Sequence, residues 1–291
     1  MTGEELEKHT PKISASASVR RDGFIWRIAS AAVLAPAALA AVFAGGALFA
    51  AAVAFCAIIM LFEWTRMVEG RDFTPIFYVQ ALAAVGALVA ASAGKFELAF
   101  GLCAAAAAAG AVLEMRADTQ RASWIAFGPA YILAPSVALI WLRTAVENGQ
   151  VLTLMLFLIV WAADSGGYFG GRLVGGPKMS PALSPAKTWA GAVGGVIFGA
   201  LAGFGVARAV FGEGATGFYI LAGASLGLAS ILGDMAESGF KRIFGVKDAS
   251  GLIPGHGGFL DRLDGMIFAT TAMTLVLFLH MIGARVYGVQ G

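Results

Sequence analysis

Long apolar stretches separated by short polar segments make up most of the sequence. A helix that crosses the hydrocarbon core of a bilayer needs about 20 mostly apolar residues. Stretches of that size predict nine membrane-spanning helices, near 24–44, 45–62, 73–93, 96–113, 124–142, 151–171, 189–210, 217–233 and 266–284. Only Gly45 and Gly46 separate the first two, so the alternative is that they form one long re-entrant or tilted segment, which gives eight spans. The pattern predicts an all-α, polytopic integral membrane protein.

The composition supports this interpretation. Of the 291 residues, 59% are hydrophobic and only 13% are charged, whereas soluble proteins carry about 25% charged residues. These values exclude a soluble enzyme, a disordered chain and a nucleic-acid-binding domain, and the net charge of +2 gives no sign of a polyanionic partner. Cys56 and Cys103 lie inside apolar stretches without ligand spacing, so we expect small hydrophobic side chains there and neither a disulfide nor a metal site.

The basic residues predict the orientation in the membrane. With the amino end inside, only Lys95, Arg143, Arg208 and Arg285 of the 20 Lys and Arg fall on the outer side, which is a strong positive-inside pattern. We therefore expect an integral membrane protein whose two longest connections lie on the cytoplasmic side. Its predicted parts are a cytoplasmic tail (1–23), amino-terminal transmembrane helices (24–150), and a catalytic region (151–291) with cytoplasmic loops at 172–188 and 234–265.

Small residues recur at helical spacing in the later spans. The glycines of this pattern are Gly191, Gly195, Gly199, Gly203, Gly223 and Gly227. Such stripes let helix backbones approach closely in lipid, and we favour this packing role over a groove for a lipid chain. The same faces would also allow a homodimer. Trp26, Trp64, Trp124 and Trp141 lie near predicted span ends, where tryptophans form interfacial belts.

Four aspartates are the first candidates for chemistry. Asp164 lies within the span 151–171, and Asp234 closes the span 217–233 with Glu237 three residues later on the same helix face. A charge at membrane depth is costly unless it is paired, solvated or bound to a metal, which makes these residues functional candidates. Their alternative role is to pair with a nearby Lys or Arg. Asp261 and Asp264 also share a helix face and suit Mg²⁺, although acids at a helix start can equally serve the helix dipole.

Candidate phosphate-binding residues surround these acids. Residues 255–258 read Gly-His-Gly-Gly, a loop that can present backbone N–H groups to phosphate oxygens through Gly257 and Gly258. His256 between them is a candidate acid, base or phosphate contact. The cationic residues that flank the loop and could bind substrate phosphates are Lys241, Arg242, Lys247 and Arg262. The positive-inside rule alone would also place Lys and Arg in such a loop.

A second candidate anion site precedes the span 189–210. Ser184, Lys187 and Thr188 stand just before that helix, and a helix amino terminus with hydroxyls and a lysine attracts anions. The alternative is a Pro-rich turn in which Thr188 caps the helix. One rim of the bundle thus combines carboxylates that could bind Mg²⁺ with Lys and Arg side chains that could bind phosphates. This combination indicates phosphoryl-type chemistry. The substrates would be a soluble nucleotide or pyrophosphate compound and a membrane lipid.

One stretch carries a specific resemblance to a known family. The sequence SGFKRIFGVKDASGLIPGHGGFLDRLD, Ser238 to Asp264, closely resembles the signature of the phosphatidate cytidylyltransferases (CDP-diacylglycerol synthases). Asp234 and Glu237 fit the lead-in of that signature. Two further matches are the Ser-Pro-x-Lys-Thr motif at 184–188 and the Trp-x-x-Asp-Ser motif at 161–165. The resemblance covers 161–265, and Ala190 departs from it where many members carry Glu.

The resemblance implies that CTP and phosphatidate react to give CDP-diacylglycerol and pyrophosphate. It implies Mg²⁺, with a second, monovalent cation left open, held by Asp234 and Asp261 with Asp264 and Asp164 in support. Lys187, Lys241 and Arg262 would hold phosphates, and Ser184, Thr188 and His256 would orient CTP. The implied partners are therefore CTP, phosphatidate and membrane lipid. The implied location is the bacterial inner membrane, with the active site facing the cytoplasm.

Three other classes share some of these features. A membrane-embedded prenyltransferase would need a second Asp-rich motif in an earlier helix, and the first 160 residues lack one. A CDP-alcohol phosphotransferase would need Asp-Gly-x-x-Ala-Arg followed by spaced aspartates, which is absent. A transporter would distribute its charges over repeated halves near the midplane, whereas the charges here gather at one face.

Overall fold

The computed structural model describes residues 32–212, 216–253 and 257–287, with only the backbone described for 280–287. Eight helices in these ranges are long and apolar enough to cross a membrane, and a shorter apolar helix, Ala32–Ala44, precedes them. The eight are α2 (Gly46–Glu69), α3 (Pro75–Ser92), α4 (Phe96–Glu114), α5 (Thr119–Ala145), α6 (Gly149–Leu173), α7 (Trp189–Val210), α8 (Thr216–Ile243) and α9 (Leu260–Tyr287). The predicted helical, polytopic membrane class is thus confirmed.

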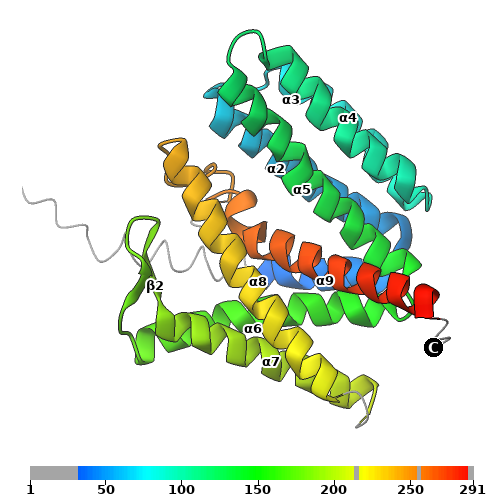
Figure 1. Ribbon diagram of the computed structural model, residues 1–291, viewed down its shortest axis with the longest axis vertical. Coiled ribbons are helices and arrows are strands. Elements are labelled where there is room, and N and C mark those ends of the chain that lie inside the picture. The colour runs from blue at the N-terminus through cyan, green and yellow to red at the C-terminus, as the bar shows by residue number, and fades with distance from the viewer. Residues whose placement is uncertain (1–31, 213–215, 254–256, 288–291) are drawn as a thin grey trace, which may run out of the picture.

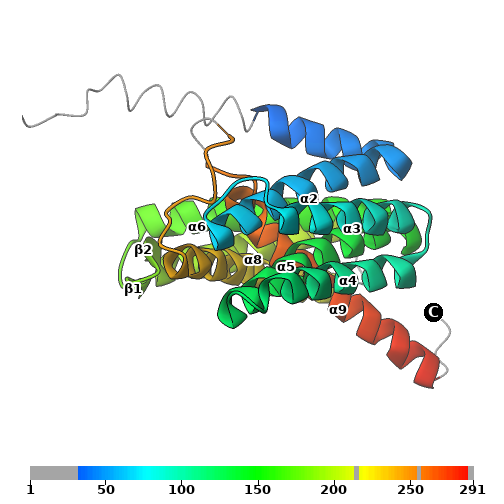
Figure 2. The same ribbon diagram turned by 90° about the horizontal axis from the view of Figure 1, so that it is seen from above.

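The chain reverses direction between the first two predicted spans. Gly45 (φ 62°) and Gly46 (φ 50°) adopt the left-handed backbone conformation that glycine tolerates. The helix Ala32–Ala44 therefore folds back against α2 (Figure 2), so the two stretches are separate helices and not one long segment. Within the described ranges, eight helices of spanning length are present, as the alternative predicts, and not the nine of the first prediction. Later helix starts also follow local chemistry, since Thr74 and Asp118 accept hydrogen bonds from the first-turn amides of Phe77 and Arg121.

The helices form two groups joined by α9. Helices α2 to α5 pack side by side, and α6, α7 and α8 form a second group (Figure 1). Helix α9 contacts α8 and α6 on one side and α5 and α2 on the other. Because α9 touches both groups, a residue in the first half of the chain can influence the position of residues near its carboxyl end.

Glycines bring α6, α7 and α8 into close contact. A Cβ atom added at Gly194 would lie 2.5 Å from the carbonyl oxygen of Gly166, and one added at Gly199 would lie 2.7 Å from that of Gly223. The four glycines of the α7 stripe are buried. The packing interpretation is therefore correct, and the groove alternative is wrong because neighbouring helices cover the stripe. These faces are used within the chain and give no support to a homodimer, which stays a prediction.

The segments between the last helices differ from the predicted loops. Residues 234–243 continue α8 and residues 260–265 already belong to α9, so the connection is shorter than 234–265. Between α6 and α7 the chain forms an antiparallel hairpin of β1 (Lys178–Ser180) and β2 (Ser184–Thr188). The all-α prediction missed this hairpin, since its short strands lack alternating apolar residues and β2 contains Pro185.

Trp64 belongs to the core and not to an interfacial belt. Its side chain is fully buried, and its Nε1–H donates to the carbonyl oxygen of Trp124 at 2.9 Å. The rings around it come from α5 and from the end of α8 or just beyond, and are Trp124, Phe127, Tyr131, Phe240 and Phe244. This aromatic cluster packs the carboxyl end of α8 against the amino-terminal helices, which explains why α8 continues past its apolar stretch.

Candidate active site

The ends of four helices meet around one pocket. It is lined by the later parts of α6 and α8, the first turns of α7 and α9, and the β1–β2 hairpin. Figure 1 shows the hairpin beside the end of α6 and the start of α7. The pocket has a volume of about 640 Å³, within the usual range for small-molecule sites. Its charged lining residues are Asp164, Asp234, Asp248, Asp261, Asp264, Arg172, Lys187, Lys241 and Arg262. The structure thus brings together the four carboxylates singled out in the sequence and three of the predicted cations.

Two of the carboxylates come from inside helices. Asp164 precedes the last residue of α6 by nine positions, and Asp234 precedes the last residue of α8 by nine. At 1.5 Å per residue, each lies roughly 14 Å along its helix from that end. Both line the pocket, so the pocket extends into the helical bundle and is not a feature of the loops alone.

Lys187 forms an ion pair with one of these carboxylates. Its Nζ lies 2.5 Å from Oδ2 of Asp234. The position of Lys187 follows from its neighbours: β2 runs directly into α7, and Thr188 caps that helix by accepting a hydrogen bond from the Gly191 amide at 3.1 Å. The capping role of Thr188 is therefore real, and Thr188 also lines the pocket. The ammonium group of Lys187 occupies a position at Asp234 where a cation can stand.

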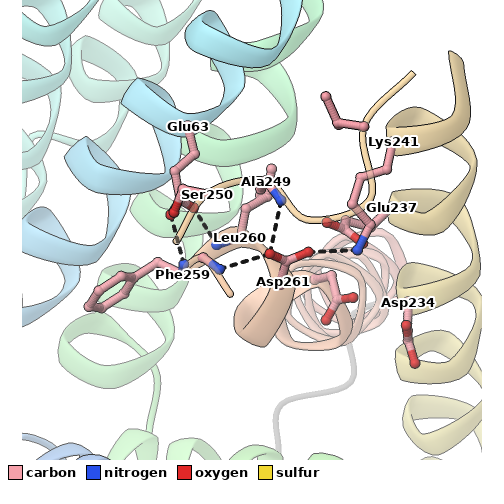
Figure 3. A network of polar contacts seen from close by, with 12 residues as sticks. Glu63, Asp234, Glu237, Lys241, Ala249, Ser250, Phe259, Leu260 and Asp261 are labelled. Atoms are coloured by element: carbon pink, nitrogen blue, oxygen red, sulfur yellow. Dashed lines mark hydrogen bonds and ion pairs between the residues drawn. The ribbon is translucent and has the colours of Figure 1, made fainter. Parts of the chain in front are cut away.

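Lys241 joins two helices through their carboxylates. Its Nζ lies 2.5 Å from Oε2 of Glu237 one turn earlier on α8, and 2.6 Å from Oδ1 of Asp261 on α9 (Figure 3). All three side chains are largely buried, with exposed fractions of 14% for Lys241, 1% for Glu237 and 5% for Asp261. Charges so poorly hydrated are tolerated only because they compensate one another. The triad fixes the end of α8 relative to the start of α9.

Asp261 also organises the loop before its own helix. Its Oδ2 accepts hydrogen bonds from the amides of Ala249 at 3.0 Å and Gly258 at 2.8 Å. Gly257 has φ 81°, and a Cβ there would lie 2.8 Å from the same oxygen. The glycine pair therefore lets the backbone approach a carboxylate of the protein. The amide of Gly258, predicted to bind phosphate, has Asp261 as its partner.

Asp264 is a buried residue of the pocket. It is 8% exposed, and its Oδ1 accepts a hydrogen bond from the Gly265 amide at 2.7 Å. The charges of Asp234, Glu237 and Asp164 act on it. A cluster of this kind is unfavourable unless a cation reduces the repulsion.

The donor set is compatible with a divalent cation. Among the described residues, no three His, Cys, Asp or Glu side chains already converge as a metal site. The pocket nevertheless supplies carboxylate oxygens, which are the ligands that Mg²⁺ prefers. Lys187 provides a stand-in positive charge at Asp234. An ionised carboxylate has about four lone-pair sites, so the three protein donors on Asp261 leave room for about one more.

Other predicted site residues are not part of the pocket lining. Ser184, Arg242, Lys247, Gly257 and Gly258 do not line it. Arg242 is exposed and donates to the carbonyl oxygen of Val246 at 3.4 Å. His256 lies outside the described residues.

The sequence analysis missed four residues of this region. Arg172 and Tyr168 line the pocket, where the Arg172 guanidinium donates to the Tyr168 hydroxyl at 3.0 Å. Asp248 also lines it, although only its place in the signature drew notice. Glu63 on α2 contacts the loop that precedes α9. The signal for Glu63 was available, because it is a charged residue inside an apolar stretch.

The fold and the pocket define the class of protein. It is a polytopic membrane protein in which carboxylates and cationic side chains line one pocket, and such a pocket suits an enzyme that acts on phosphate-bearing substrates. Residues 25–280 match the sequence model of the Cytidylyltransferase family, and the chain belongs to this family. The resemblance seen in the signature is thereby confirmed.

Relatives of the chain carry a consistent name. It is 36% identical over 220 residues to the phosphatidate cytidylyltransferases of Brucella suis and Brucella melitensis, which covers 75% of this chain and 80% of each relative. It is 43% identical over 136 residues to the phosphatidate cytidylyltransferase of Haemophilus influenzae, or 45% of this chain and 47% of the relative.

Proposed function

We propose that this chain transfers the cytidylyl group of CTP to phosphatidate, which yields CDP-diacylglycerol and pyrophosphate. Membership of the Cytidylyltransferase family and the names of its relatives support this activity. The observation that carries the proposal is a pocket at one end of membrane-spanning helices, lined by Asp164, Asp234, Asp261 and Asp264 together with cationic side chains. A lipid substrate can approach from the bilayer and a nucleotide from water.

The reaction needs positioned charges more than a strong base. A phosphate oxygen of phosphatidate attacks the α-phosphorus of CTP and forms the new P–O bond. The bond from the α-phosphorus to the oxygen bridging to the β-phosphorus breaks, and pyrophosphate leaves with that electron pair. Because the attacking phosphate is already anionic, the protein has to bring two anions together and stabilise the charge of the transition state.

Three cationic residues are placed to do this. In the proposal Lys187 and Arg262 bind the triphosphate, since both line the pocket. The ammonium group of Lys187 then leaves Asp234 and binds a phosphate oxygen instead. Lys241 remains between Glu237 and Asp261 and contributes its charge from there. The pocket carboxylates exclude anions from other positions, so the phosphates are directed toward these cations.

A divalent cation completes the proposal. Asp234 and Asp264 would hold it, with Asp164 and the remaining lone pair of Asp261 as further ligands. When bound, such an ion offsets phosphate charge and stabilises the leaving pyrophosphate. The positive-inside pattern supports an active site on the cytoplasmic side of a bacterial inner membrane.

The purified chain in detergent tests the proposal. With labelled CTP and phosphatidate, we expect lipid-soluble label that depends on both substrates. We also expect EDTA to abolish it and added Mg²⁺ to restore it. Transfer that persists in EDTA would contradict the role of the divalent cation but not the cytidylyl transfer. Absence of lipid-soluble label with Mg²⁺ present would overturn the activity itself.

A further inference from the structure

Glu63 is a buried carboxylate far from the signature in sequence. It lies on α2, outside the stretch 161–265 that carries the signature motifs, and it is 0% exposed. It does not line the pocket. A buried carboxylate in a membrane-spanning helix is unfavourable unless other groups stabilise it, so its partners indicate its role.

All of the hydrogen-bond partners seen for Glu63 belong to the segment between α8 and α9 or to the start of α9. Oε1 accepts from the hydroxyl of Ser250 at 2.5 Å and from the amide of Phe259 at 3.0 Å, and Oε2 accepts from the amide of Leu260 at 2.7 Å. Figure 3 shows the Glu63 side chain reaching from α2 to these donors. Gly258 completes the arrangement, because a Cβ there would overlap the Glu63 carboxylate.

The contact fixes the first turn of α9. Leu260 begins that helix, and a carboxylate at a helix amino terminus satisfies free amides and complements the helix dipole. Asp261, Arg262 and Asp264 follow within that turn and the next, and all three line the pocket. Asp261 holds the same loop from its other side, through Ala249 and Gly258. Glu63 therefore holds, from the α2 side, the turn that carries the pocket residues of α9.

We propose that Glu63 is a positioning residue of the active site, which holds the start of α9 from the amino-terminal helices and so places Asp261, Arg262 and Asp264 for the reaction. The proposal rests on the proposed cytidylyl transfer. It predicts that the loss of Glu63 slows turnover in protein that remains folded, because small displacements of catalytic groups have large effects on rate.

Glu63→Gln tests this role with little change of shape. The amide nitrogen cannot accept a hydrogen bond, so one of the two backbone contacts, at Phe259 or Leu260, loses its acceptor. We expect kcat at saturating CTP and phosphatidate to fall by about 10–100-fold per folded molecule, as for other residues that support a site from behind. Hydrogen–deuterium exchange at residues 257–264 should become faster than in the wild type.

Gln80→Met is the matched control. Gln80 is also 0% exposed in the amino-terminal helices, and its amide group donates to the carbonyl oxygens of Ala106 and Ile125, away from the loop. This variant should lower the thermal midpoint but keep kcat within about twofold of wild type, since it leaves the position of the catalytic groups unchanged. Equal kcat values for Glu63→Gln and wild type would overturn the proposal.

Ser250→Ala keeps the proposal testable if Glu63→Gln does not fold. It removes one donor to Glu63 from an accessible loop, and Ser250 does not line the pocket. We expect a smaller fall in kcat, with exchange at 257–264 again faster, and unchanged values of both would count against the role. The wild-type rate separates the two hypotheses, because an inactive wild type contradicts the proposed function, whereas an active wild type with fully active variants contradicts only the role of Glu63.

Discussion

Asp261 combines two tasks in one side chain. One carboxylate oxygen accepts a hydrogen bond from the Lys241 ammonium group. The other oxygen accepts hydrogen bonds from the amides of Ala249 and Gly258. The same carboxylate therefore fixes the loop before α9 and adds a negative charge to the pocket. The sequence alone indicated Asp261 as a metal ligand or a helix cap, and the contacts show that it stabilises the loop before its helix.

Asp261→Asn should abolish cytidylyl transfer while the chain still folds. The amide cannot supply two acceptor oxygens, so either Lys241 or the loop amides lose their partner, and one negative charge disappears from the pocket. Loss of one preorganised electrostatic group costs about 10²–10³-fold in rate. Turnover measured on detergent-purified, monodisperse protein checks this, and retained turnover would remove Asp261 from the active site.

Lys241→Met should destabilise the protein strongly. It leaves Glu237 and Asp261 without their shared cation, and removal of one partner from a buried ion pair costs about 3–5 kcal/mol. Lys241→Arg, which keeps the charge, should lose less. Thermal unfolding in detergent measures the difference.

Lys178→Met serves as the control for Lys241→Met. Lys178 is exposed and its Nζ donates only a long, 3.4 Å hydrogen bond to the Ala186 carbonyl oxygen, so we expect a change within about 0.5 kcal/mol. If Lys241→Met and Lys178→Met unfold at the same temperature, the charge triad is not a source of stability.

Helices α6, α7 and α8 depend on the absence of side chains where their backbones meet. The spacing of four residues between glycines predicted close packing, and the structure identifies the partner helices. The sequence could not predict which helices would be the partners. A stripe of small residues predicts that another helix packs closely against it but does not identify that helix. The end of α8 and the start of α9 could not be predicted from the hydropathy pattern either. Tertiary contacts, such as that of Phe240 with Trp64, extend α8 beyond its apolar stretch.

Gly199→Ala should destabilise the bundle through this contact. The added Cβ would lie 2.7 Å from the Gly223 carbonyl oxygen, and overpacking of this kind costs about 1–3 kcal/mol. Gly205→Ala on the same helix meets nothing within 4 Å and should be neutral or slightly stabilising, because alanine favours helices. Thermal midpoints of the two variants in detergent decide the matter, and equal values would contradict the packing account.

At the scale of the whole molecule, the site depends on both halves of the chain. The pocket itself is built from α6 to α9, as the signature region predicted. Glu63 and the aromatic cluster around Trp64 connect that region to α2 and α5. Asp164, Asp234 and Asp264 were predictable as charges in apolar segments. Glu63 carried the same signal without a surrounding motif, and only the fold reveals its contact with residues almost 200 positions away.

The central claim is that this pocket transfers the α-phosphorus of CTP to a lipid phosphate. The most direct measurement follows label from CTP marked at the α- or the γ-phosphorus, with phosphatidate, in wild type, Asp234→Asn and Asp118→Asn. Asp118 is the matched control, because it caps α5 outside the pocket and asparagine also caps helices. We predict that α-label alone enters the lipid, at a normal rate in Asp118→Asn and about 10²–10³-fold more slowly in Asp234→Asn. Lipid that carries the γ-label, or an Asp234→Asn variant as fast as wild type, would contradict the account.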